Sequence, residues 1–146
     1  MSEIIPSGSG SLYSEVAPLH YRTNYDQPNP FRFLISCMSA EPGGDNFIGV
    51  DFRLEYYMCY EDTVLSVESG EVVSCVRSVL VTDEGLMYSF ASIGIANDLR
   101  RLAAIYGDSA ISPPLPARVD ARPARRGKIY RLVAAPPGPV NGASRG

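Results

Sequence analysis

An alternation of side chains between positions 48 and 59 constrains the fold of this chain most strongly. Apolar residues occupy every second position of this run: Ile48, Val50, Phe52, Leu54, Tyr56 and Met58. A period of two over this length is typical of a long β-strand that buries one face. A long half-buried strand needs neighbours to pair with, so the sequence predicts a core built on a sheet.

Two further strands are predicted downstream of this run. Residues 72–81 are rich in valine and end at the acidic turn Thr82-Asp83-Glu84-Gly85, and residues 86–91 return as a third strand. Glycine at the end of such a turn supplies the positive φ that a short hairpin connection requires. We therefore expect three consecutive antiparallel strands.

The period then changes from two to that of a helix. Ser92 is a suitable N-cap residue, and Gly107 stands where a C-terminal cap is expected. Between them, apolar residues recur at spacings of four, three and four: Ile95, Leu99, Leu102 and Tyr106. This spacing predicts one amphipathic helix.

The last part of the pattern is a hairpin. Residues 117–122 and 128–133 both read as strands, and Arg125-Arg126-Gly127 lies between them. The complete order is β-β-β-α-β-β, so the chain is predicted to be mainly β with one helix. That order is typical of the OB-fold, a small Greek-key barrel.

The predicted domain spans residues 47–133 and is flanked by two less regular ends. Residues 1–46 are expected to form an N-terminal arm with flexible Ser/Gly chemistry at positions 7–11 and a short strand at 31–38. Residues 134–146, rich in proline and glycine, are expected to form a disordered tail. A chain of 146 residues fits one domain of this size.

The composition argues against most kinds of catalysis. There is one histidine, His20, and the three cysteines are too few and too widely spaced for a zinc cluster or a disulfide scaffold. We identify no phosphate-binding glycine loop, metalloprotease motif or nucleophile elbow. The sequence therefore predicts a protein that is not an enzyme and that holds no metal or other cofactor.

The sequence also predicts where the protein resides. It has no run of about 18 apolar residues, and its first residues do not have the pattern of a secretion signal. We expect a cytoplasmic protein that does not insert into a membrane.

Charge is divided unevenly along the chain. Residues 1–98 carry four arginines and fourteen acidic residues, a net −10, whereas residues 99–146 carry nine basic and two acidic residues, a net +7. A basic segment rich in arginine suits bidentate contacts with phosphate groups. The split therefore favours a partner that is a polyanion. The alternative is that the two segments face one another across the fold or across a subunit interface.

Basic and aromatic residues that could bind such a partner gather in the later strands. Tyr57 is predicted on the polar face of its strand, and Tyr88 and Phe90 share a face of the third. The aromatic residues expected to stack on bases are Tyr57, Tyr88, Phe90 and Tyr130. The basic residues expected to contact phosphates are Arg118, Arg122, Arg125, Arg126, Lys128 and Arg131. The alternative for these residues is an ordinary aromatic core and a solvated turn.

Part of the chain resembles a known group of proteins. Residues 79–95, from Val79-Leu80-Val81 through the acidic turn to Ser92-Ile93-Gly94-Ile95, look like the small single-stranded DNA-binding proteins of phages and mobile elements. Pro113-Pro114-Leu115 and the hairpin ending at Lys128-Ile129-Tyr130 extend the resemblance over residues 48–133. It implies binding of single-stranded DNA, without base-specific readout, during replication or recombination.

The chain departs from the related bacterial housekeeping proteins at its C-terminus. Those proteins end in an acidic tip that recruits partners, whereas this sequence ends Ala143-Ser144-Arg145-Gly146. Recruitment through an acidic tail is therefore not expected here.

Two other functions fit the same sequence. A structural or assembly protein, such as a small virion component, would use its arms for contacts between identical subunits. The aromatic residues Tyr13, Tyr21, Tyr25 and Phe31 would then anchor an oligomer. A regulatory module could instead place its acidic face in the nucleic-acid groove of another protein.

Overall fold

The computed structural model describes residues 20–66, 68–125 and 127–136. The elements in these ranges are mainly strands, joined by two helices. In chain order they are β1 (Tyr21–Thr23), α2 (Phe31–Met38), β2 (Glu41–Pro42), β3 (Phe52–Leu65), β4 (Val72–Thr82), β5 (Met87–Ala91), α3 (Ile93–Tyr106), β6 (Leu115–Pro123) and β7 (Lys128–Ala134). The predicted Ser/Gly linker at 7–11 lies outside the described residues, as does most of the predicted tail.

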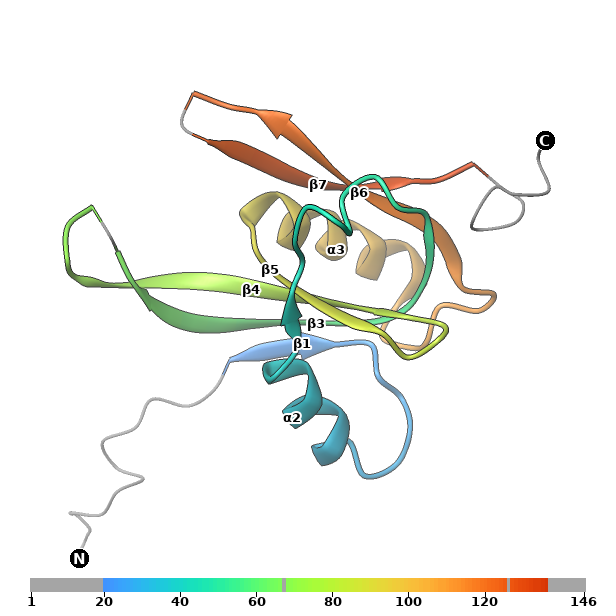
Figure 1. Cartoon of the computed structure of the whole chain (residues 1–146). Helices are drawn as coiled ribbons and strands as arrows, with labels where there is room; N and C mark the ends of the chain where they lie inside the picture. Colours follow the sequence, from blue (N-terminus) through green and yellow to red (C-terminus); the bar gives the residue numbers. More distant parts are fainter. Residues whose placement is uncertain (1–19, 67, 126, 137–146) are drawn as a thin grey trace, which may run out of the picture.

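The strands form one curled, mixed sheet that resembles half of a barrel (Figure 1). Its order is β2-β5-β4-β3-β6-β7, and β1 pairs with β3 beside β6. All pairings are antiparallel except the short parallel pairing of β2 with β5. Helix α3 lies in the bend of the sheet, between the part made by β3–β5 and the β6–β7 hairpin.

The main core fills the space between the inner face of the sheet and α3. Its most deeply buried members include Leu54 and Leu80 from the sheet and Ile95 and Leu99 from the helix. Ile95 and Leu99 therefore confirm part of the predicted apolar stripe of α3, whereas Tyr106, predicted on the same stripe, is 44% exposed. The helix also begins and ends as predicted, because the Ser92 side chain accepts a hydrogen bond from the Ile95 N–H and Gly107 is the C-cap residue with φ 80°.

The long alternating run is only partly one strand. Ile48 and Val50 lie in the loop before β3, and the register of β3 against β4 shifts between Leu54 and Tyr56. Such an irregularity reverses which positions face the core. Leu54 and Tyr57 consequently belong to the same buried cluster, whereas Met58 lies in a second cluster.

Residues 31–38 form helix α2, so the strand predicted there is wrong. Phe33 and Cys37, four positions apart, are the buried residues of this helix and pack in a cluster with Met58 of β3. The ring of Tyr25 stacks on that of Phe33 with a centroid distance of 4.0 Å. This part of the sheet is therefore buried on both faces, which explains why the apolar pattern of β3 is denser than a half-buried strand requires.

The described N-terminal segment contributes two strands, β1 and β2, to the sheet. β1 pairs with β3 through Tyr21–Tyr60, and β2 pairs with β5 through Glu41–Tyr88. The Asn24 side chain is fully buried, and its Oδ1 accepts a hydrogen bond from the Tyr57 N–H at 2.8 Å. The sheet thus includes strands on both sides of the domain boundary predicted at residue 47.

Within the described ranges, neither helix has the length and apolar character needed to cross a bilayer.

Candidate functional site

The β6–β7 hairpin carries the exposed basic residues of the predicted binding site. Pro123 pairs with Lys128 at its end, and the Ala124 N–H donates to the Gly127 carbonyl at 3.1 Å. Gly127 has φ 79°, the conformation expected for glycine in a tight hairpin connection. The predicted hairpin is therefore confirmed, while Arg126 at its tip lies outside the described residues.

Two arginines of this hairpin are exposed and pair with no carboxylate among the residues that the structure describes: Arg122 and Arg125. Lys128 is exposed as well, and its Nζ lies 3.7 Å from an oxygen of the exposed Asp45. Ion pairs between exposed groups contribute little. Lys128 therefore remains available to another anion. We call the end of the β6–β7 hairpin, which carries Arg122, Arg125, Lys128 and Tyr130, the basic hairpin.

A hollow of about 380 Å³ lies beside the basic hairpin, where the end of β5, the start of α3 and the start of β7 meet. Lys128, Ile129 and Tyr130 line one side, and Ile93 and Gly94 line the other. Tyr130 is partly buried, with its ring centroid 5.8 Å from that of Phe90. The structure thus brings a cation and an aromatic ring of the sequence prediction together at one hollow.

The sequence fits the close approach of α3 and β7 at this hollow. A Cβ on Gly94 would lie 2.5 Å from the carbonyl oxygen of Tyr130, so only glycine fits there without a shift. The Ser92 hydroxyl, which caps α3, also donates to the same carbonyl oxygen at 3.2 Å. These contacts fix the first turn of the helix against the strand that carries Tyr130.

Arg131, for which the sequence predicts a phosphate contact, forms an ion pair within the fold. Its Nε and Nη2 atoms donate to the two carboxylate oxygens of the buried Asp98 at 2.9 and 2.8 Å. Burial opposes ionisation of Asp98, but hydrogen bonds from Arg131 and the Leu132 N–H outweigh it and hold the pKa of the carboxyl below its usual value. The pair joins α3 to β7 and uses the charge of Arg131 within the fold.

Arg118 is also paired with carboxylates. Its Nε lies 3.6 Å from Asp51 and 3.9 Å from Asp120, and about one third of its side chain is exposed. The sequence prediction that it contacts phosphates is therefore not favoured by this geometry. The pairing with Asp51 could not be read from the sequence, because Asp51 lies on the loop before β3, far from Arg118 along the chain.

Two of the four predicted stacking residues lie in the core. Tyr57 is 2% exposed and Phe90 is 4% exposed, so neither presents a face to a base. Tyr57 was expected on the polar side of its strand, but the register shift before Tyr56 turns it inward. Tyr88 and Phe90 do share a face, as predicted, but it is the inner face that carries the main core.

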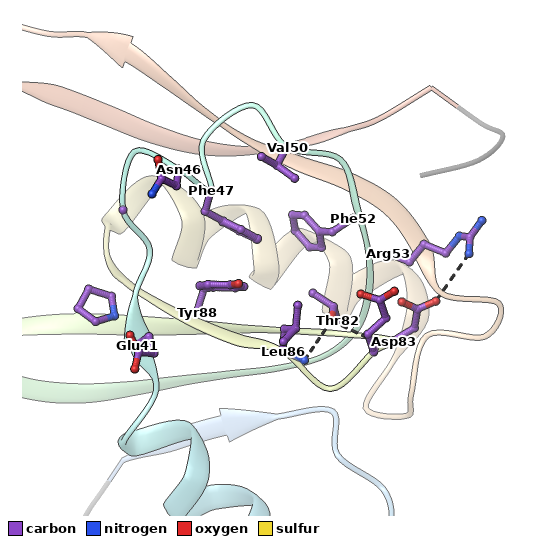
Figure 2. Close-up of a pocket in the computed structure, with 13 residues that line it drawn as sticks. Glu41, Asn46, Phe47, Val50, Phe52, Arg53, Thr82, Asp83, Leu86 and Tyr88 are labelled. Atoms are coloured by element: carbon purple, nitrogen blue, oxygen red, sulfur yellow. Dashed lines mark hydrogen bonds and ion pairs between the residues drawn. The ribbon is translucent and has the colours of Figure 1, made fainter. Parts of the chain in front are cut away.

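Tyr88 is only partly buried and lies in a different pocket from Tyr130. This second cavity, about 540 Å³ in volume, lies between the loop before β3 and the turn joining β4 and β5. Figure 2 shows the rings of Phe47, Phe52 and Tyr88 along it, with Glu41 toward one end and Asp83 toward the other. We call this cavity the acidic pocket, and define it by Glu41, Phe47, Phe52, Asp83, Glu84 and Tyr88.

The cysteines and acidic residues of the described part of the chain do not form a metal centre. No group of three or more His, Cys, Asp or Glu side chains within these ranges could hold a metal ion. Cys37, Cys59 and Cys75 are free thiols, and burial raises the pKa of Cys37 to about 12. A thiol that stays protonated is a poor nucleophile.

Comparisons with protein-family models, curated proteins and solved structures find no match to this chain. The geometry of the described residues therefore carries the functional argument.

Proposed function

We propose that this protein binds single-stranded nucleic acid through the basic hairpin, with DNA favoured over RNA and without recognition of the base sequence. The observation that carries the proposal is that Arg122 and Arg125, exposed and without a carboxylate partner among the described residues, lie on the same hairpin as Lys128 and Tyr130, which line the hollow. Cations neutralise phosphates, and an accessible aromatic ring stacks on bases of any kind.

The arrangement of the strands supports this use of the hairpin. β3, β4 and β5 form a meander, α3 follows, and β6 returns to pair with β3 before β7 pairs with β6. This arrangement is consistent with a small β-barrel such as the OB-fold, in which the loop between the fourth and fifth strands takes part in oligonucleotide binding. The corresponding loop in this chain joins β6 to β7 and contains Arg125.

Two features favour the hairpin over other surfaces of the sheet. Helix α2 covers part of the outer face of β3 and β4. OB-folds commonly bind their ligands on the second and third strands, which correspond to β4 and β5, so α2 obstructs part of that face. The β3–β4 hairpin extends in the same direction as the β6–β7 hairpin (Figure 1), but its end carries the exposed Glu71. Carboxylates repel phosphates, so the nucleic acid would follow the β6–β7 side.

A double substitution with a charge-matched control tests the proposal. Arg122→Ala with Arg125→Ala should weaken binding of oligo-dT and reduce the slope of log K against log salt by about 1.4, as expected for two lost phosphate contacts. The control is Arg32→Ala with Arg100→Ala, which removes two exposed arginines from α2 and α3. It should change the slope much less. Equal losses in the two double variants would contradict a site on the hairpin.

A second candidate function is assembly, because α2 presents an uncovered apolar stripe. Phe31, Ile35 and Met38, at spacings of four and three, are 75%, 47% and 40% exposed. Exposed apolar patches are common at protein–protein interfaces. Sedimentation velocity with wild type and Phe31→Ser tests this function. A concentration-dependent oligomer that the substitution abolishes would support it, and a monomer at all concentrations would contradict it.

A further inference from the structure

We propose that the acidic pocket binds an elongated aliphatic dication of the polyamine class. This function is separate from the proposed nucleic-acid binding, because the pocket shares no lining residue with the hollow beside the basic hairpin. The volume of the pocket, the positions of its carboxylates and the rings between them support a ligand of this class.

The charge of the pocket favours a cation. Glu41, Asp83 and Glu84 contribute three carboxylates to its lining, and Arg53 contributes one guanidinium, which lies 3.8 Å from an Asp83 oxygen. The lining therefore has an excess of two negative charges. A doubly charged cation would balance this excess, whereas a phosphate or a nucleic acid would be repelled.

The positions of the carboxylates favour an elongated cation over a metal ion. Glu41 comes from β2, whereas Asp83 and Glu84 come from the turn between β4 and β5. In Figure 2, Glu41 and Asp83 lie toward opposite ends, with Tyr88 and Leu86 between them. A divalent metal needs several oxygens around one point at about 2–2.6 Å. An alkyl diamine instead places one ammonium group at each end.

The middle of the pocket suits the apolar stem of such a ligand. The rings of Phe47 and Tyr88 stack with a centroid distance of 4.0 Å, and Phe52 packs against Phe47 at 5.1 Å. Leu86 and Val50, which are 49% and 45% exposed, add aliphatic surface to the lining. Methylene groups gain by leaving water for such surroundings, while the ammonium groups stay near the carboxylates.

The walls of the pocket are held in place before any ligand binds. In the β4–β5 turn, the Thr82 hydroxyl accepts hydrogen bonds from the N–H groups of Glu84 and Leu86 at 3.2 and 3.1 Å. On the other wall, the Gly43 N–H donates to the Ser89 carbonyl at 2.9 Å. A pocket formed in advance loses less conformational entropy on binding, which raises the affinity of a small ligand.

The experiment is an NMR titration of the full chain with putrescine, followed by backbone amide shifts at low salt. Butylamine, which has a similar stem but one charge, and magnesium chloride, which has two charges and no stem, serve as comparison ligands. The variants are Glu41→Gln and Glu84→Gln. Glu71→Gln, at an exposed position outside the pocket, is the charge-matched control.

With putrescine we expect saturable shifts confined to the amides of residues 41–53 and 82–88. Butylamine should bind wild type about tenfold more weakly than putrescine does, and putrescine should bind both pocket variants about tenfold more weakly than wild type. A tenfold change in Kd is a difference of ~1.4 kcal/mol. Glu71→Gln should bind as wild type does. The proposal is overturned by an absence of saturation, by equal weakening in Glu71→Gln, or by butylamine or magnesium acting on these amides as strongly as putrescine.

Discussion

Replacing Asp98 by Asn should destabilise the protein by about 2 kcal/mol at neutral pH. Oδ1 of Asp98 accepts from Arg131 and Arg101, and Oδ2 accepts from Arg131 and the Leu132 N–H. In either orientation, an asparagine would point its NH₂ group at two donors. Removing one partner of a buried ion pair lowers the free energy of unfolding by ~3–5 kcal/mol. We expect a smaller loss here, because about a third of the Arg131 side chain is exposed and water can solvate its charge in the variant.

The effect should depend on pH with a definite sign. The pKa of Asp98 is lower in the folded protein than its ordinary value of 3.8, so its contribution to stability is complete above that value. It is lost as the pH falls through the lower pKa of the folded state. The difference in unfolding free energy between wild type and Asp98→Asn should therefore be largest near neutral pH and decrease below about pH 4.

Urea unfolding followed by circular dichroism measures this difference, since the chain has no tryptophan. Glu71→Gln, which changes an exposed carboxylate, is the control and should stay within about 0.5 kcal/mol of wild type. The reasoning is refuted if Asp98→Asn costs less than about 0.5 kcal/mol at pH 7, or if its cost is unchanged at about pH 2.5.

Three further substitutions or modifications test the packing. Gly43→Ala should lower the free energy of unfolding by about 2 kcal/mol, measured by thermal unfolding, because the new Cβ would clash with the Phe90 ring. Gly44→Ala is the control and should lower it far less, because nothing lies within 4 Å of a Cβ at that position. Ser92→Ala should cost about 1 kcal/mol by removing the N-cap of α3, and an unchanged melting temperature would contradict that role. The Cys37 thiol, fully buried, should react with a disulfide reagent only after unfolding, and labelling at the rate of a free thiol would contradict its burial.

The parts of the fold that were predicted correctly depend on local signals. The α3 helix has its cap at Ser92, and the two hairpin turns that the sequence predicts have glycines with positive φ, Gly85 and Gly127. Each of these signals acts over a few residues. The basic hairpin was predicted for the same reason, because Arg122, Arg125 and Lys128 lie on one hairpin.

The parts that were predicted incorrectly depend on contacts between distant segments. The short apolar run at 31–38 fits a strand or a helix. In the structure it is a helix, which buries Phe33 and Cys37, four positions apart, against β3. A register shift in β3 likewise sets which face Tyr57 occupies, and no residue type in the sequence marks that shift. The pairing of Arg131 with Asp98 joins two elements, so neither residue alone reveals it.

The central claim is that the basic hairpin makes this protein a binder of single strands, and fluorescence anisotropy tests it most directly. The measurement uses labelled oligo-dT of about 30 nucleotides and a duplex of equal length, each at two salt concentrations. We expect saturable binding of the single strand that weakens steeply with salt, and much weaker binding of the duplex. No binding of the single strand at low salt, or equal binding of both, would contradict the claim.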